Sequence, residues 1–248
     1  MLELAAKLPP GALIDGDDRL LGEAVLRTGG ARFIARESAM VWTNGGISGW
    51  RESHLAVEAV PAGPNTGNSK FEAGPPGALV LAEGVNCGFT LPGFAPEVEA
   101  FTVAVIFRSD GEGKTLASVF TGQANNMIFL TEGDGVLLAK DRQSTLEVSL
   151  PVPRGRVVKL ALLGFDGRIL RLGLGAARAE ASGNIPGLAH RADFFIGCRS
   201  NRGGLAKTLG AAHLHELLFW PDRCLMGSDE AEDLAALAAL DRHVRWTY

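Results

Sequence analysis

Short apolar runs recur along the second two-thirds of the chain. β-Branched and aromatic residues are common in these runs, and turn-forming residues lie between them, which is typical of short strands joined by turns. The runs are 78–81, 87–91, 101–108, 115–120, 127–131, 136–139, 146–150, 157–163, 168–174, 194–198 and 214–220. One amphipathic stretch follows them near the end of the chain. The order predicts an all-β protein, a two-sheet β-sandwich that ends in a helix.

The run 101–108 alternates most clearly. Because successive side chains of a strand point to opposite faces, every second residue shares one face. We expect the larger apolar set to face the core between the sheets; it consists of Phe101, Val103, Val105 and Phe107. Between runs 157–163 and 168–174, the pair Asp166-Gly167 predicts a hairpin with a type I′ turn, because both central positions of that turn need a positive φ.

The closing helix has a predicted start and a predicted apolar stripe. Ser228 or Asp229 can cap its first amides, and Asp229 as the cap places Glu232 at a capping-box spacing. The stripe consists of Leu234, Leu237, Leu240 and Val244. We expect this stripe to cover one edge or face of the sandwich.

Residues 61–77 contain four prolines and four glycines, a composition that interrupts helices and strands alike. We therefore divide the chain into an irregular N-terminal segment or anchor, residues 1–75, and a sandwich, residues 76–248. Within the first part, 17–27 suits a short helix and 32–36 and 40–43 suit short strands. The alternative is that residues 1–75 supply the first strands of the same sandwich.

Composition narrows the function classes. The 248 residues suffice for one large all-β domain, and the net charge of -4 argues against nucleic acid as a partner. The three cysteines are too few for a disulfide-stapled scaffold and lack the spacing of a metal site. Charged residues near the N-terminus argue against a signal peptide, and no apolar run is long enough to insert in a membrane. We expect a soluble chain made in the cytoplasm.

Several of these runs, taken in order, resemble the concanavalin A-like superfamily, particularly laminin G-like and pentraxin-like jelly rolls. They are Ala78-Leu-Val-Leu81, the run 101–108, Gly167-Arg-Ile-Leu-Arg-Leu172, Phe194-Phe-Ile-Gly-Cys198, His213-Leu-His-Glu-Leu-Leu-Phe-Trp220 and a helix that begins Ser228-Asp-Glu230. The resemblance covers residues 76–248 and implies a two-sheet antiparallel jelly-roll sandwich with a C-terminal helix. Members of such families bind glycans, sometimes with calcium, or cleave them, or serve in adhesion.

The catalytic acids of that superfamily are not recognisable in this chain. Glycoside hydrolysis needs two carboxylates across the sugar, and the superfamily's hydrolases resemble one another in a strand with three alternating acids. Only Glu97-Val-Glu99 comes near this pattern, and it continues without a third acid. We interpret both glutamates as solvating the start of a strand. No nucleophile elbow or phosphate-binding loop is present either, so no catalytic residue is predicted.

Metal and cofactor binding is not predicted. His213 and His215 share one face of a predicted strand beside Glu216, but no third ligand lies near in sequence. The acidic turns 110–112 and 132–134 offer oxygens of the kind that calcium prefers. Ordinary hairpin turns explain both segments as well, so calcium remains an alternative to the prediction of no cofactor.

Candidate binding residues lie in loops. A sugar needs a flat apolar face for stacking and a few convergent polar groups. Two tryptophans flank the segment 43–49, and polar side chains occupy the loops 123–126 and 199–202. The predicted carbohydrate-binding residues are Trp42, Trp50, Asn125, Asn126, Arg199, Asn201 and Arg202. The alternative is that both tryptophans pack the N-terminal part onto the sandwich.

The leading hypothesis is a non-catalytic glycan-binding or adhesion module. A lectin-like chain without a signal peptide suggests a surface spike or fibre component of a phage or phage-like particle that binds bacterial surface polysaccharide. Its partners would be that glycan and other particle subunits or further copies of itself. The alternatives are a polysaccharide hydrolase or lyase with an unrecognised active site, and a purely structural particle protein.

Overall fold

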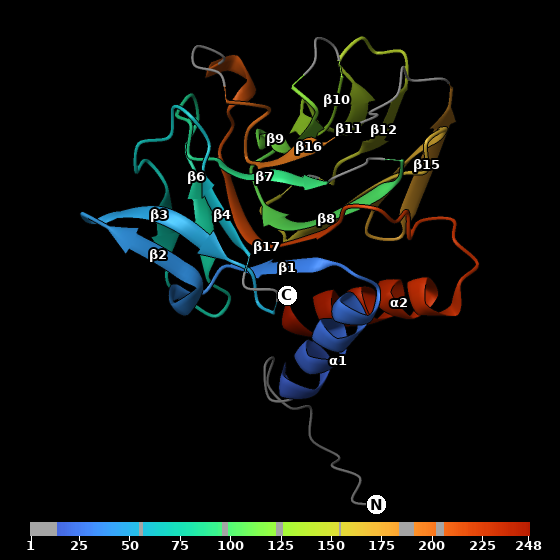
Figure 1. Cartoon of the computed structure of the whole chain (residues 1–248), viewed down its shortest axis with the longest axis horizontal. Helices are drawn as coiled ribbons and strands as arrows, with labels where there is room; N and C mark the ends of the chain where they lie inside the picture. Colours follow the sequence, from blue (N-terminus) through green and yellow to red (C-terminus); the bar gives the residue numbers. More distant parts are fainter. Residues whose placement is uncertain are drawn as a thin grey trace, which may run out of the picture.

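The computed structural model describes residues 14–54, 57–95, 99–122, 126–153, 155–183, 191–201 and 206–248. Within these residues it is an antiparallel sandwich of two sheets with two helices (Figure 1), which confirms the predicted all-β fold and its C-terminal helix. The helices are α1 (Ile14–Arg27) and α2 (Ala231–Thr247). The strands are β1 (Ala31–Ile34), β2 (Met40–Thr43), β3 (Gly46–Arg51), β4 (Glu58–Pro61), β5 (Lys70–Glu72), β6 (Ala78–Leu81), β7 (Phe89–Ala95), β8 (Phe101–Arg108), β9 (Lys114–Phe120), β10 (Met127–Gly133), β11 (Val136–Asp141), β12 (Glu147–Pro151), β13 (Lys159–Phe165), β14 (Ile169–Leu174), β15 (Ala177–Ser182), β16 (Ala192–Ile196) and β17 (Ala212–Trp220).

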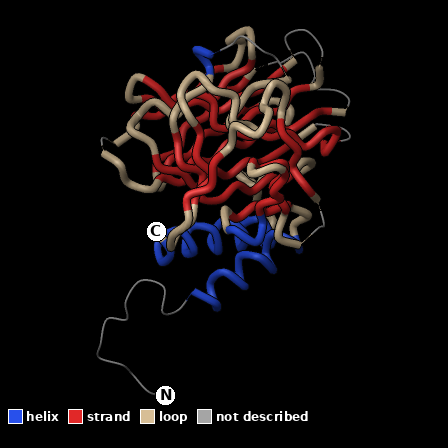
Figure 2. The backbone as a smooth tube through the Cα atoms, turned by 90° about the vertical axis from the view of Figure 1, so that its left-hand side faces the viewer, coloured by secondary structure: helices blue, strands red, loops and turns tan. Residues whose placement is uncertain are grey.

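The two sheets differ in what covers them. In one, the strand order is β15-β14-β13-β8-β17-β6-β5, and β1 also pairs with β17. Both helices pack on its outer face, so we call it the helix-covered sheet (Figure 2). The other has the order β12-β11-β10-β9-β16-β7-β4-β3-β2, and we call it the open sheet. Strands from the first 75 residues thus belong to both sheets.

The main core lies between the sheets. The alternation along β8 is confirmed, because Phe101, Val103, Val105 and Phe107 are all fully buried in this core. The rings of Phe194 and Phe219, one from each sheet, stack with their centroids 4.1 Å apart. A second apolar cluster lies under the helices, where Ala104 and Ile106 from the other face of β8 are also buried. The molecule therefore has three layers: helices, helix-covered sheet and open sheet.

Four strands were not predicted, and each lacks a run of large apolar residues. They are β3, β4, β5 and β15. Strand β15, with the sequence Ala-Arg-Ala-Glu-Ala-Ser, is an edge strand with no fully buried residue. An edge strand buries little, so its sequence carries little hydrophobic signal.

The hairpin between β13 and β14 is present, but the predicted turn type is wrong. Gly167 has a φ of +89°, whereas Asp166 is not among the residues with a positive φ. The Asp166 carboxylate instead accepts the backbone N–H groups of Arg168 and Ile169, at 3.0 and 2.7 Å. This side-chain turn closes the loop in place of the type I′ geometry.

The closing helix begins later and faces the core differently than predicted. Its N-cap is Glu230, which makes no capping side-chain bond, and Ser228 accepts the Glu230 amide before the helix starts. Leu234 is 52% exposed, so the predicted stripe is wrong at that position. The buried residues of α2 are Asp233, Ala236, Leu240 and His243.

A β-bulge at His215 changes the direction of side chains on β17. Leu214 pairs with Phe107 of β8 and Glu216 pairs with the next residue, Ile106, so His215 is the extra residue. Leu214 and Leu217 both face the core between the sheets. Consequently His215 and Glu216 both project from the helix-covered face, where regular alternation would place only one of them.

Glu216 connects both helices to this sheet. Its carboxylate is 2% exposed and accepts Nε of Arg32 on β1 at 2.9 Å. It also accepts the His243 Nε2 and the Tyr248 hydroxyl, at 2.6 and 2.9 Å. Arg32 in turn contacts the Asp18 carboxylate of α1 at 2.6 Å. Burial by itself would raise the pKa of Glu216, but the Arg32 guanidinium and His243 outweigh it and lower the pKa to about 2.

Replacing Glu216 by Gln should destabilise the fold by about 3 kcal/mol, because the Arg32 guanidinium would stay buried without its buried counter-charge. Chemical denaturation measures this change. A matched control is Glu147→Gln, which removes an exposed ion pair with Lys140 and should change the free energy of unfolding by less than about 0.5 kcal/mol. Equal effects of the two substitutions would contradict this account.

The pH dependence follows from the same group. Since the pKa of Glu216 is lower in the folded state than its ordinary 4.5, the ionised carboxylate contributes stability above pH 4.5. That contribution should be lost as the pH falls from 4.5 towards about 2. The Glu216→Gln variant should show a shallower loss of stability over this range when both proteins are unfolded in urea. Parallel curves would show that other carboxylates carry the acid sensitivity.

Candidate functional site

Trp50 does not belong to a binding surface. Its side chain is fully buried, its ring makes an edge contact with Phe33 at 5.6 Å, and its indole N–H donates to the Ile34 carbonyl at 3.1 Å. No ring face remains for a ligand. For Trp50, the alternative interpretation therefore holds: this tryptophan packs the N-terminal strands onto the sandwich.

Trp42 is 49% exposed and lies on the β2–β3 hairpin. The hairpin turns at Asn44-Gly45, where both residues have a positive φ, 51° and 80°. This is the geometry that an Asn-Gly pair favours in a two-residue hairpin. The turn lies at the tip of β2 and β3, beside Trp42, and it places the exposed side chain of Asn44 next to a groove.

The groove separates this hairpin from the segment 61–67 and has a volume of about 470 Å³. We call it the hairpin groove. Its lining consists of residues 43–48, Pro61 and residues 65–67. The two walls meet closely at two glycines: a Cβ on Gly46 would lie 3.2 Å from the Cα of Gly67. Larger residues at either position would separate the walls.

Asn65 fixes the second wall of the groove. Its side-chain amide donates to the Gly88 carbonyl at 2.8 Å and to the Ser69 hydroxyl at 2.9 Å. Its side-chain oxygen accepts the amides of Gly67 and Asn68. Since Asn65 is buried and fully hydrogen-bonded, it holds the loop in place and offers nothing to a ligand.

Asn201 joins the loop that continues this wall. Its side-chain oxygen accepts the Gly63 amide at 2.9 Å, so a segment far along the chain lies against the segment 61–67. The structure thus brings Asn201 and Trp42 to the same end of the open sheet.

Arg199 lies elsewhere on the open sheet. Its guanidinium stacks on the Phe129 ring at 3.9 Å, and its Nε donates to the Thr115 hydroxyl at 3.0 Å. Burial and the nearby Arg142 lower the pKa of Arg199 to about 10, so it remains a cation at neutral pH. No carboxylate pairs with it among the described residues.

The predicted site is therefore divided between two places. Asn126 follows the end of β9, which pairs with the start of β16, whereas Arg199 follows the end of β16. Asn125 and Arg202 lie outside the described residues. Strand β10, which carries Phe129, and strand β2 are six strand spacings apart in the sheet, roughly 30 Å. A single small ligand cannot contact both groups.

Comparison with solved structures identifies the architecture. Domain 4 of AbnA, a GH43 extracellular arabinanase from Geobacillus stearothermophilus solved with arabinotriose, superposes with a TM-score of 0.57 at 12% identity. The fold that the chain shares with this domain is a jelly-roll β-sandwich. A Trypanosoma rangeli sialidase in complex with sialic acid gives a TM-score of 0.51 at 14% identity. A structure of botulinum neurotoxin type C, whose cell entry depends on two ganglioside molecules, gives 0.55 at 7% identity.

The length of chain shared differs among these proteins. The alignment covers 84% of this chain and 97% of the arabinanase domain. The alignment with the sialidase covers 93% of the chain but only 39% of the sialidase, and the alignment with the neurotoxin covers 85% of the chain but 50% of the neurotoxin chain. No family model and no curated protein matches the sequence. At these identities the similarity establishes the fold.

The histidine and acidic candidates have local structural roles. His213 is half-buried, with its Nε2 3.0 Å from the Glu72 carboxylate, while His215 is buried. Asp110 pairs with Arg156, and Glu132 pairs with Lys159 at 2.9 Å. No group of three potential metal-ligating side chains occurs among the described residues. Within the acidic pair, Glu99 is exposed and Glu97 lies outside the described residues.

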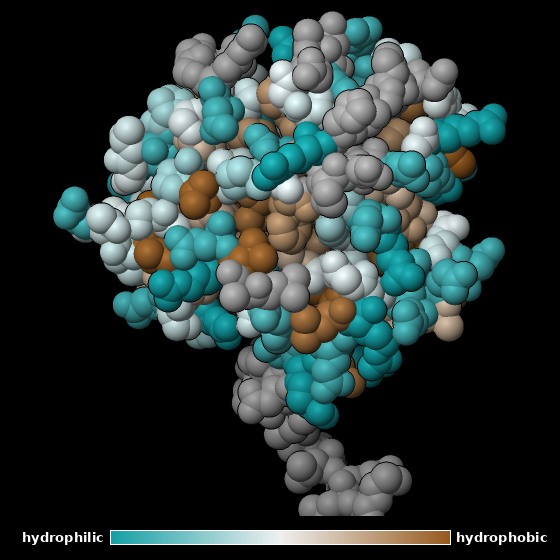
Figure 3. All heavy atoms as spheres, in the orientation of Figure 1, coloured by the Kyte–Doolittle hydropathy of each residue, from teal (hydrophilic) through white to brown (hydrophobic). Residues whose placement is uncertain are grey.

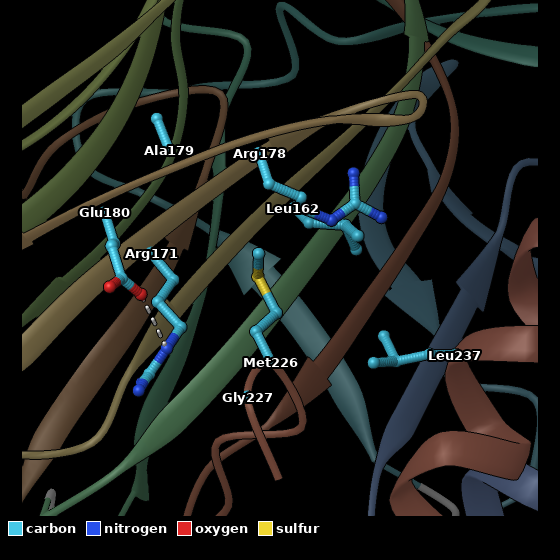
Figure 4. Close-up of a pocket in the computed structure, with 8 residues that line it drawn as sticks. All are labelled: Leu162, Arg171, Arg178, Ala179, Glu180, Met226, Gly227 and Leu237. Atoms are coloured by element: carbon cyan, nitrogen blue, oxygen red, sulfur yellow. Dashed lines mark ion pairs between the residues drawn. The ribbon is translucent and has the colours of Figure 1, made fainter.

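A second pocket, of about 430 Å³, lies between α2 and the strands β13 to β15 (Figure 4). Arg171 points into it but is engaged by Asp166 and Glu180. Met226 and Leu237 form its apolar side. The carboxylates neutralise Arg171, and Arg178, which also lines the pocket, donates to the Gly175 and Ala177 carbonyls. Because both arginines are already engaged, this pocket offers a ligand less than the hairpin groove does. Among the helices of the described residues, none is long and apolar enough to cross a membrane.

Sequence reasoning missed the polar side chains that the groove exposes. Asn44 and Thr66 are exposed there, and the structure records no side-chain hydrogen bond for either. The Asn44-Gly45 pair is a hairpin signal that could have located the turn. The segment 61–67 carries no comparable signal, because its position depends on bonds to Gly88 and Asn201.

The two tryptophans should differ sharply in their contribution to stability. We expect Trp50→Ala to lower the free energy of unfolding by about 3–5 kcal/mol, because it leaves a cavity in the core. Trp42→Ala should change it by less than about 0.5 kcal/mol, as an exposed substitution. Urea denaturation of both variants tests this assignment, and a large cost at Trp42 would show that its ring is a packing element.

Proposed function

We propose that this chain is a non-catalytic glycan-binding module and that it binds sugar at the hairpin groove. The observation that carries the proposal is the half-exposed ring of Trp42 on the hairpin whose turn, from Thr43 to Ser48, lines the polar groove. A tryptophan face provides the apolar surface on which a sugar ring stacks.

The groove supplies groups that suit sugar hydroxyls. Asn44 offers both a donor and an acceptor, and Thr66 offers a hydroxyl. Thr43 and Ser48 are hydrogen-bonded to each other at 2.8 Å across the hairpin, and each keeps lone pairs for a further partner. Asn65 holds this arrangement rigidly, which reduces the entropy lost on binding.

The hydrophilic character of the surface around the strands suits a polar ligand. On the face drawn in Figure 3, hydrophilic residues cover most of the area, and hydrophobic ones are exposed in separate patches. Neighbouring folds support the same ligand class, since their structures were solved with arabinotriose or sialic acid. Arg199, whose guanidinium lies over Phe129 on β10, is a candidate second contact for a long polysaccharide.

The finer hypotheses remain predictions. Membership of a phage-like particle and contacts with particle subunits would be decided by copurification of the chain with such a particle. Polysaccharide cleavage would appear as release of reducing ends. Two of the neighbouring folds belong to glycosidases, but the match to the sialidase covers 39% of that protein.

Trp42→Ala should weaken polysaccharide binding at least tenfold, equivalent to about 1.4 kcal/mol, because the stacking face is lost. Affinity electrophoresis in gels that contain bacterial surface polysaccharides or arabinan measures the effect. The matched control is Trp246→Ala, since Trp246 is 62% exposed but lies on α2. Absence of retardation in every polysaccharide, or an equal loss in the control, would overturn the proposed function.

A further inference from the structure

A further pocket lies at the point along β17 where its neighbouring strand changes from β6 to β1. Along one edge of β17, residues 212–214 pair with β6 and residues 216–219 pair with β1. The bulge residue His215 stands at this junction. Its carbonyl accepts the Ala35 amide after β1, and its Nδ1 bonds the Gly77 carbonyl before β6, both at 2.8 Å. The junction is open to a pocket of about 500 Å³ that His215 lines.

The imidazole of His215 has one unused nitrogen. Because a carbonyl only accepts, Nδ1 must carry the proton that bonds Gly77. Nε2 is buried and has no hydrogen-bond partner among the described residues. Burial is also the main cause that lowers the pKa of His215, so the ring is neutral at pH 7 and Nε2 presents a lone pair. A buried acceptor without a donor is unusual in a folded protein and requires an explanation.

Several ring side chains form part of the pocket wall around His215. Tyr248 packs against the His215 ring with centroids 5.3 Å apart, and its hydroxyl is already donated to Glu216. Phe71, Pro75 and Pro76 line the pocket as well. Such walls suit the faces of a small ring-shaped molecule.

The charges around the pocket disfavour ionic ligands. Glu216 is neutralised within its buried network, and the lone pair of Nε2 repels an anion. Arg36 and Glu37, which carry opposite charges, both line the pocket and are exposed. A cation would also face Arg108, which acts on the His215 ring. The acceptor at His215 instead calls for an O–H donor on a neutral molecule.

We propose that this pocket binds a small neutral ring compound, a sugar unit or a phenol, whose hydroxyl group donates to Nε2 of His215. The site is separate from the hairpin groove and does not depend on the proposed function. If sugars bind, it provides a second contact for a glycan; if phenols bind, it is a distinct small-molecule site.

The test uses the whole chain labelled with ¹⁵N-histidine, in which NMR distinguishes a protonated ring nitrogen from a bare one. One series adds monosaccharides (glucose, galactose, arabinose and N-acetylglucosamine), and the other adds phenol and p-cresol. We expect a saturable shift of the Nε2 resonance of His215 in one series. His213, whose Nε2 contacts Glu72, is the internal control and should not shift.

A blocking variant keeps the proposal falsifiable without altering His215. Ala73 is exposed and lines the pocket, so Ala73→Trp should obstruct it and weaken binding at least tenfold. His215→Phe keeps a ring beside Tyr248 and should abolish binding, provided that circular dichroism shows a folded chain. The proposal would be overturned if the His215 resonance did not shift in either series, or if Ala73→Trp bound the ligand as tightly as the unmodified chain. A bound water would then be the donor to Nε2 of His215. Trp42→Ala should bind the small ligand normally, which separates this outcome from failure of the proposed function.

Discussion

The burial of one carboxylate, that of Glu216, joins the helix layer to the helix-covered sheet. A bulge turns it away from the apolar core and towards the helices, where it meets Arg32 from β1 and His243 and Tyr248 at the end of the chain. An ionised group in such a place is tolerated only while every partner is present. The N-terminal strand, the last strand and the closing helix therefore depend on one another, although they are distant in sequence.

The same bulge divides β17 into two parts with different roles. Before it, β17 pairs with β6 and contributes to the wall of the His215 pocket; after it, β17 pairs with β1 and anchors the helices. The hairpin groove lies at the far end of the other sheet and is shaped by different means, a two-residue turn and the hydrogen bonds of Asn65. A substitution in one site should thus leave the other site unchanged, because no residue lines both.

The elements that bury the most apolar surface were the ones predictable from the sequence. Strand β8 has its bounds and its core face as expected, because alternation is strong when one face meets another sheet. Strand β15 buries no large side chain, and in β3 Ser48 and Gly49 interrupt the apolar sequence between its two large buried residues, Ile47 and Trp50. Neither strand therefore shows a continuous apolar run. Of the candidate binding residues, Trp42 and Trp50 look alike in sequence, and only packing against Phe33 distinguishes the buried one. The partners of Asn201 and Arg199 depend on long-range loop contacts that no local pattern encodes.

The position of the helices determines how the molecule can be attached to something else. Both α1 and the C-terminal residue Tyr248 lie in the helix layer, on the side of the sandwich away from the open sheet (Figures 1 and 2). A tether joined to the C-terminus would therefore leave the outer face of the open sheet accessible to solvent. Immobilising the protein through that end orients every copy alike, so that an array of them on a bead or surface presents a uniform open sheet.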